Sequence, residues 1–141
     1  MVQKIPTMVP VVALALVAED GQVLLHQRGA GGEHGGLWEF PGGKVEAHEA
    51  PEDALCREIA EELAIALHRA SLVPVAFASD PRLPPAAREP YVILLYLCRR
   101  WQGEPRAVEG QGIGWFALEA LEALPMPPLD RPLIAALQRA I

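Results

Sequence analysis

The sequence of 141 residues contains few cysteines, and its cysteines and histidines do not have the spacing of a zinc site. Cys56 and Cys98 are the only cysteines, and no CxxC pair is present. The four histidines also lack the spacing of a zinc site. We therefore expect two reduced, buried thiols, as is typical of a cytoplasmic protein.

Basic residues are also scarce, and they are dispersed. Twelve Lys and Arg stand against 18 Asp and Glu, which gives a net charge of −6, and the chain has no Lys/Arg cluster. Because duplex DNA and long RNA bind to basic surfaces, a nucleic-acid polymer is not an expected partner. A nucleotide is still possible, since a divalent metal can carry its phosphates.

No apolar run is long enough to span a bilayer, so we predict no membrane partner. The run at residues 8–18 follows Lys4, and a signal-peptide core is one interpretation of it. However, Pro10 lies near its start and the turn at residues 19–21 follows at once. We interpret the run as a strand that is buried on both faces, and we expect a monomer or a weak homodimer.

Apolar residues make up 51% of the chain, which is enough for the core of a single domain spanning residues 1–141. The patterns predict strands at residues 8–18, 22–28, 37–40, 44–46, 72–78, 91–97 and 115–116. They predict helices from Pro51, over residues 117–124 and near Asp130, which would cap the last helix. Loops or turns are expected at residues 29–36, 79–90, 101–105 and 125–128. This order favours an α/β fold with a mixed sheet.

The first predicted helix carries an acidic stripe. Glu58, Glu61 and Glu62 are spaced i, i+3 and i+4, so they project from one face of a helix. Three carboxylates on one stripe repel one another unless a cation lies among them, and Mg²⁺ and Mn²⁺ prefer carboxylate oxygens. A solvated polar face is the alternative interpretation.

The stretch at residues 43–65 resembles the Nudix box, GX5EX7REUXEEXGU, in which U is a bulky aliphatic residue. Eight of the nine specified positions match, namely Gly43, Glu49, Arg57, Glu58, Ile59, Glu61, Glu62 and Ile65. The exception is Ala64, where the family has a glycine at the end of the helix. Alanine in the left-handed conformation common at that position would cost about 1 kcal/mol, unless the helix ends differently.

The similarity extends from residue 11 to residue 137 and is closest to the MutT-like subgroup. The segments that carry it outside the box are LWEFPGGK at 37–44, WQGEP at 101–105, EGQ at 109–111, Trp115 and PPLDRPLI at 127–134. The resemblance implies an α/β/α sandwich with a mixed β-sheet between helices.

The resemblance also implies an activity, the Mg²⁺-dependent hydrolysis of a nucleoside triphosphate to the monophosphate and pyrophosphate, with Mn²⁺ as a substitute. The subgroup implies 8-oxo-dGTP as the substrate. A pyrophosphatase for CTP or modified pyrimidine nucleotides is an alternative. A nucleotide-binding Nudix domain without catalysis is an alternative of another class, although such domains usually lose box glutamates that this chain retains.

The same resemblance implies the residues of the site. The metal ligands would be the Gly42 carbonyl and Glu58, Glu61, Glu62 and Glu109. Glu58 would be a ligand, a base or both, Arg57 would orient the carboxylates, and Glu49 would pair with Arg57. The substrate-binding residues would be Arg28, Phe40, Lys44 and Asp130. An ionised Asp130 accepts hydrogen bonds from a guanine edge or from the amino group of cytosine, which leaves the base open.

Overall fold

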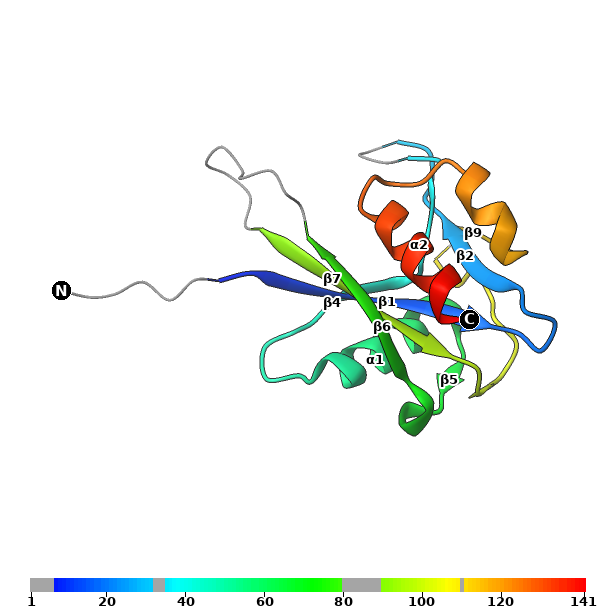
Figure 1. Ribbon diagram of the computed structural model, residues 1–141. Helices are drawn as coiled ribbons and strands as arrows, with labels where there is room; N and C mark the ends of the chain where they lie inside the picture. The colour runs from blue at the N-terminus through cyan, green and yellow to red at the C-terminus, as the bar shows by residue number, and fades with distance from the viewer. Residues whose placement is uncertain (1–6, 32–34, 80–89, 110) are drawn as a thin grey trace.

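The computed structural model describes residues 7–31, 35–79, 90–109 and 111–141. Lys4, His34 and all but the ends of the loop predicted at 79–90 lie outside the described residues. Within them, seven strands form one mixed sheet (Figure 1). These strands are β1 (Val9–Val17), β2 (Val23–Gln27), β3 (Trp38–Glu39), β4 (Gly42–Lys44), β6 (Val73–Ser79), β7 (Tyr91–Cys98) and β9 (Gly112–Phe116).

The strand order is β3-β2-β1-β7-β6, with β4 also paired to β1 and β9 to β2. β1 is parallel to β7 and antiparallel to β2 and β4, so the sheet is mixed as predicted. A second, two-stranded sheet joins β5 (Ala66–Leu67) to β8 (Trp101–Gln102).

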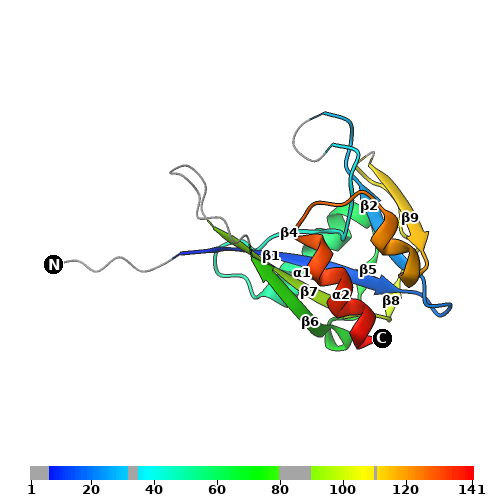
Figure 2. The same cartoon turned by 45° about the horizontal axis from the view of Figure 1, so that its top comes forward.

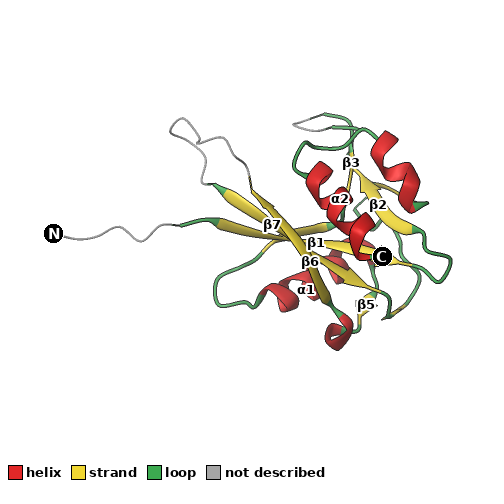
Figure 3. Ribbon diagram, viewed as in Figure 1, coloured by secondary structure: helices red, strands yellow, loops and turns green. Residues whose placement is uncertain are grey.

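Helices cover both faces of the large sheet. The helix α1 (Pro51–Leu63) lies on one face, and α2 (Asp130–Ala140) lies on the other (Figures 2 and 3). Two 3₁₀ helices, η1 (Arg69–Ser71) and η2 (Leu118–Ala123), complete the described elements. The predicted α/β/α sandwich is therefore confirmed. Among the described residues, no helix has the length and apolar character to cross a membrane.

β1 is the centre of the packing, because it is buried on both faces. Val12, Leu14 and Leu16 belong to the core beneath α1, whereas Ala13 and Ala15 belong to the core beneath α2. All five side chains are at most 5% exposed. The interpretation of this run as a doubly covered strand is confirmed, and it explains why the run is apolar without alternation.

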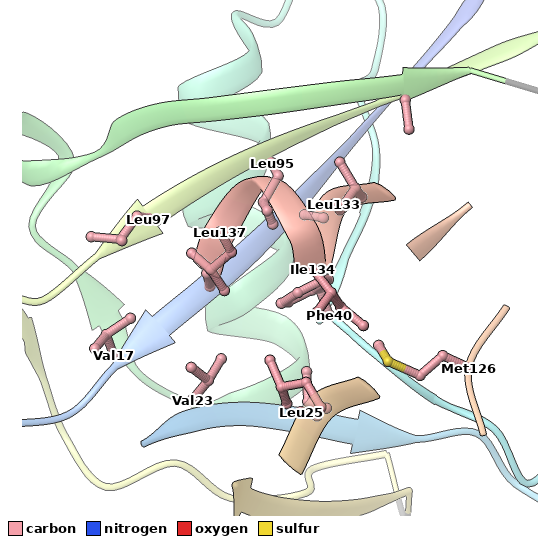
Figure 4. Packing of buried hydrophobic residues seen from close by; sticks show 14 residues of the cluster. Val17, Val23, Leu25, Phe40, Leu95, Leu97, Met126, Leu133, Ile134 and Leu137 are labelled. Atoms are coloured by element: carbon pink, nitrogen blue, oxygen red, sulfur yellow. The ribbon is translucent and has the colours of Figure 1, made fainter. Parts of the chain in front are cut away.

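The two helices reach the sheet through apolar faces of the expected period. α1 buries Leu55, Ile59 and Leu63, which are one turn apart, so its glutamates are left along other sides of the helix. α2 contributes Leu133 and Ile134 to the opposite core (Figure 4).

Several predicted boundaries were wrong. The strand expected at 44–46 is Gly42–Lys44, where β4 passes so close to Val12 of β1 that a side chain at Gly42 would meet backbone. The turn expected at 101–105 begins with β8, a strand too short to show any periodicity. The strand expected at 115–116 begins at Gly112, and the helix expected at 117–124 is a 3₁₀ helix.

Asp130 was expected to cap α2, but it does not. The N-cap residue is Leu129, which makes no capping bond through its side chain, and Asp130 is the first residue of the helix. Its carboxylate is buried and faces Phe40 instead. The position of Asp130 therefore needs an explanation other than helix capping.

Ala64 takes the left-handed conformation that glycine would adopt more easily. Its φ is 58° and its ψ is 34°, and its N–H donates to the Ala60 carbonyl at 3.2 Å. The helix thus ends in the way the box glycine would end it, and the alanine bears the strain.

Replacing Ala64 by glycine is expected to raise the free energy of unfolding by about 0.5–1 kcal/mol, since relief of the strain exceeds the added entropy of the unfolded chain. Urea unfolding followed by circular dichroism measures the change. Ala60→Gly, at an exposed position inside the same helix, is the control and should lower stability by about 1 kcal/mol. A loss of stability in both variants would contradict the explanation.

Candidate active site

The acidic residues of α1 lie against the glycines of β4. A Cβ atom added at Gly43 would overlap the carboxyl group of Glu58, so only glycine allows this approach. The Glu58 side chain is 17% exposed and lies between the strand and Arg57. The structure thus brings the first box glycine and the first glutamate of the acidic stripe into contact.

In the part of the chain that the structure describes, Glu62 is the member of the acidic stripe whose carboxylate is buried without a partner for one of its oxygens. Its Oε2 atom is buried and has no hydrogen-bond partner among the described residues. Burial, followed by the negative charges of Glu58 and Glu109, raises the pKa of Glu62 to about 8, and the Gly42 backbone amide opposes the shift without cancelling it. A carboxylate in this environment is stabilised by a positive charge placed beside it.

Val108 and Gln111 are both bonded to the end of α1. The backbone N–H of Val108 donates to the Glu62 carbonyl at 3.1 Å, and Gln111 Nε2 donates to the same oxygen at 3.4 Å. Gln111 Oε1 in turn accepts from the Glu109 N–H at 3.0 Å. These bonds keep Glu109 beside Glu62. Gln111 belongs to the segment EGQ that resembles the MutT-like subgroup, but no role was predicted for it.

The acidic group fits a divalent cation. No three His, Cys, Asp or Glu side chains within the described ranges are already arranged as a complete ligand set. However, the unpartnered oxygen of Glu62 and the Glu58 carboxylate over Gly43 supply hard oxygen donors of the kind that Mg²⁺ and Mn²⁺ bind. Glu61 is more open, with 57% of its side chain exposed.

Arg57 links the acidic residues to the loop that precedes α1. Its Nε and Nη2 atoms donate to the two carboxylate oxygens of Glu49 at 2.8 and 3.0 Å, and its Nη1 donates to Glu58 Oε1 at 3.0 Å. Nη2 also donates to the Lys44 carbonyl at 3.1 Å, and Nη1 lies 3.5 Å from Glu61. The predicted pairing of Arg57 with Glu49 is present, and Arg57 also lies within ion-pair distance of Glu61.

The ion pair fixes the charges of both partners. The hydrogen bond from Arg57, followed by that from the Glu46 N–H, lowers the pKa of Glu49 to about 2. The same pairing with Glu49 raises the pKa of Arg57 above its usual value. Since a guanidinium forms two parallel bonds to one carboxylate, this contact also sets the orientation of Arg57 toward Glu58.

A cavity of about 620 Å³ opens beside these residues. Arg28, Phe40, Lys44 and Asp130, the four predicted substrate-binding residues, all line it. Gly42 and Gly43 form the part of its wall that adjoins the carboxylates of α1. Residues that are far apart in the sequence thus surround one cavity, and the carboxylates of α1 lie at one side of it.

Asp130 is the buried charged group of this cavity. It is 5% exposed, and its Oδ2 accepts a long hydrogen bond of 3.4 Å from the Phe40 N–H. Burial, followed by the negative charge of Glu39, raises the pKa of Asp130 to about 7. The carboxyl group can therefore be a donor as well as an acceptor near neutral pH.

Glu39 also lines the cavity, and sequence reasoning had missed it. Burial alone would raise its pKa, but hydrogen bonds from His26 and Arg28 outweigh burial and hold the pKa below its usual value. Glu39 therefore stays ionised at neutral pH, where Asp130 is only partly ionised. The only sequence signal for it was its place in the segment LWEFPGGK, directly before Phe40.

Comparisons with known proteins show the family of the chain. The family model described as the NUDIX domain matches residues 7–137. The chain is 35% identical over 122 residues to the 8-oxo-dGTP diphosphatase of Escherichia coli (strain K12). The aligned region covers 86% of this chain and 89% of the relative. It is 37% identical over 131 residues to the CTP pyrophosphohydrolase of the same strain, covering 92% and 90%.

A solved structure gives the same result. The crystal structure of the MutT NUDIX hydrolase from Burkholderia pseudomallei has a TM-score of 0.73 and 34% identity, and the match covers 96% of this chain and 99% of that one. The box, the cavity beside it and matches over nearly the whole chain lead to one conclusion, that the chain belongs to the Nudix family of hydrolases.

Proposed function

We propose that the chain is a Mg²⁺-dependent pyrophosphohydrolase that converts 8-oxo-dGTP to 8-oxo-dGMP and pyrophosphate. One observation carries this proposal. The cavity has Gly42, Gly43 and Lys44 beside the acidic residues of α1, and it also has Phe40 and Asp130 on its wall. A nucleotide whose base lies against Asp130 can therefore extend its phosphates toward the carboxylates.

The cation would be held by Glu58, Glu61, Glu62, Glu109 and the Gly42 carbonyl. Nudix hydrolases generally use divalent metals, and a bound cation supplies neutralisation of phosphate charge and a lowered pKa for water. The chain's own residues do the positioning. Arg57 holds the Glu58 carboxylate in place, Glu49 holds Arg57, and the exposed Lys44 is free to reach a phosphate oxygen.

The base would lie between apolar and polar groups of the cavity. Phe40 is buried in the wall, so its backbone and ring contribute to the shape of the pocket. Asp130 would contact the base edge, and Arg28 would contact the base or a phosphate from the end of β2. A guanine edge offers N–H groups to a carboxyl oxygen and a carbonyl oxygen to a carboxyl proton.

CTP is the second candidate substrate, and the state of Asp130 favours it specifically. A neutral carboxyl group donates to one atom and accepts at its neighbour, which complements N3 and the amino group of cytosine. The pKa of about 7 leaves this form populated at neutral pH. The relative named CTP pyrophosphohydrolase supports the same possibility.

A steady-state panel separates these substrates. We expect 8-oxo-dGTP to have a higher kcat/KM than dGTP, CTP and 5-methyl-dCTP, with turnover that requires Mg²⁺ and persists with Mn²⁺. A higher kcat/KM for CTP or 5-methyl-dCTP would reverse the substrate assignment. Tight binding without turnover of any of the four nucleotides would instead indicate a nucleotide-binding domain without catalysis.

We also infer that the protein acts in the cytoplasm as a monomer or a weak homodimer. Both cysteines are free thiols, with Cys98 buried and Cys56 partly buried, which suits a reducing compartment.

A further inference from the structure

Glu39 is held at one of its two oxygens only. His26 Nε2 lies 2.9 Å from Glu39 Oε1, and Arg28 Nε donates to the same atom at 2.7 Å. Within the described part of the chain, Oε2 receives no hydrogen bond, although Glu39 lines the cavity and its side chain is only 14% exposed. The second oxygen is therefore available to a ligand in the cavity.

The sheet places His26 directly beneath this carboxylate. In the pairing of β2 with β3, His26 is the register partner of Glu39, so the two side chains leave the sheet on the same face. An ionised carboxylate only accepts hydrogen bonds, so the Nε2 atom of His26 carries the proton. His26 has 13% of its side chain exposed, against 47% for Arg28, so His26 is the more closely packed of the two donors.

Stability does not explain the histidine. Its Nδ1 atom is buried and has no hydrogen-bond partner among the described residues. A buried nitrogen without a partner lowers stability, so the packing of the ring gives no reason for a histidine rather than an apolar residue in this place. Whatever His26 contributes must come through its other nitrogen, which contacts Glu39.

We propose that His26 is a positioning residue for base selection, which fixes Glu39 so that Oε2 accepts a hydrogen bond from an exocyclic amino group of the bound base. This inference rests on the proposed function, because it requires that the cavity hold a nucleotide base. The substrate class is then nucleotides whose base carries an amino group, such as guanine or cytosine. Uracil presents a carbonyl oxygen at the corresponding position, which an ionised carboxylate repels.

The neighbouring Asp130 supports this division of roles. The two carboxyl groups share the cavity wall and are close enough for the charge of Glu39 to raise the pKa of Asp130. Glu39, with its two cationic or polar donors, remains the anionic acceptor. The pocket therefore offers one fixed acceptor and one group of variable protonation.

The test compares bases that differ only at the amino group. Calorimetric titration gives dissociation constants for CMP against UMP and for dGMP against dIMP, and steady-state kinetics give kcat and KM for the corresponding triphosphates. The variants are His26→Phe, which keeps a ring without nitrogens, and His26→Gln, which keeps an N–H donor. His68→Phe, at an exposed histidine that bonds Ser71, is the matched control.

We expect His26→Phe to reduce the preference for the amino-bearing base by about tenfold, the scale of one hydrogen bond to a charged group. KM should rise while kcat changes little, and the variant should stay folded. His26→Gln should retain most of the preference, and His68→Phe all of it. In a Glu39→Gln background, His26→Phe should have no further effect on the preference.

Two results would overturn the inference. One is an equal loss of binding for both members of each pair in His26→Phe, which would indicate a structural role. The other is a wild-type protein that binds CMP no better than UMP and dGMP no better than dIMP. If the wild type hydrolyses no triphosphate but His26→Phe still abolishes a preference in binding, the proposed hydrolysis fails and the role of His26 stands.

Discussion

Replacing Glu58 by glutamine is expected to lower kcat by at least about 100-fold while the protein stays folded. Glutamine has nearly the same size, so it fits over Gly43 as the glutamate does. It removes the negative charge and one of the hard oxygen donors nearest the cavity. It also removes the charged partner of Arg57 Nη1, which lies 3.0 Å from Glu58 Oε1.

The measurement is a single-turnover and steady-state assay with Mg²⁺, together with thermal unfolding and circular dichroism. Glu119→Gln, at an exposed glutamate of η2, is the matched control and should keep the wild-type rate. Turnover of Glu58→Gln within a few-fold of wild type would rule out the mechanism based on carboxylates and a metal. A variant that unfolds would show instead that the Glu58–Arg57 contact maintains the fold.

Replacing Asp130 by asparagine is expected to stabilise the protein much more at pH 8 than at pH 5. The pKa of Asp130 is raised from its ordinary value of 3.8 to about 7 by burial and by the charge of Glu39. Between these two values the folded protein holds a proton that the unfolded chain has released. Stability therefore falls as the pH rises from about 4 to about 7 and stays low above that range.

The gain in the free energy of unfolding of Asp130→Asn over the wild type is at most about 4 kcal/mol at pH 8, since one pKa unit is about 1.4 kcal/mol. Asparagine keeps an oxygen that can accept the bond from the Phe40 N–H, and it carries no charge at any pH. At pH 5, only about one pH unit above the pKa of the unfolded state, the gain of the variant should be no more than about 1.7 kcal/mol. Urea unfolding at both pH values measures the gain.

Glu119→Gln again provides the control, because an exposed carboxylate should show no such dependence on pH. A gain for Asp130→Asn that is the same at pH 5 and pH 8 would mean that Asp130 titrates normally. The same variant also bears on the substrate. An amide keeps a donor and an acceptor at neutral and alkaline pH, so the activity of the variant should lose the part of its pH dependence that comes from Asp130.

Much of the candidate site could be predicted from the sequence because it is local. Helix geometry alone places Glu58, Glu61 and Glu62 on one face. Glu49, just before α1, pairs with Arg57, which is only eight residues further along the chain. The doubly covered strand was also predictable, since burial on both faces leaves a continuous apolar run in the sequence.

The rest depends on contacts between distant segments. Burial of Asp130 results from the packing of the start of α2 against Phe40, which lies between β3 and β4, and nothing near residue 130 in the sequence indicates it. His26 and Glu39 meet only because β2 and β3 pair in one register. Gln111 acts through the carbonyl of Glu62, a backbone atom that every residue possesses.

The contact between Gly43 and Glu58 gives the length of the box a geometrical meaning. One inserted residue near the start of α1 would turn the remainder of the helix by about 100° about its axis, since a helix has about 3.6 residues per turn. The Glu58 carboxylate would then turn away from Gly43. The apolar face would also turn away from the sheet, with Leu55, Ile59 and Leu63. The same count of residues therefore sets both the angular phase of the apolar face and that of the acidic group, so neither can be shifted without the other.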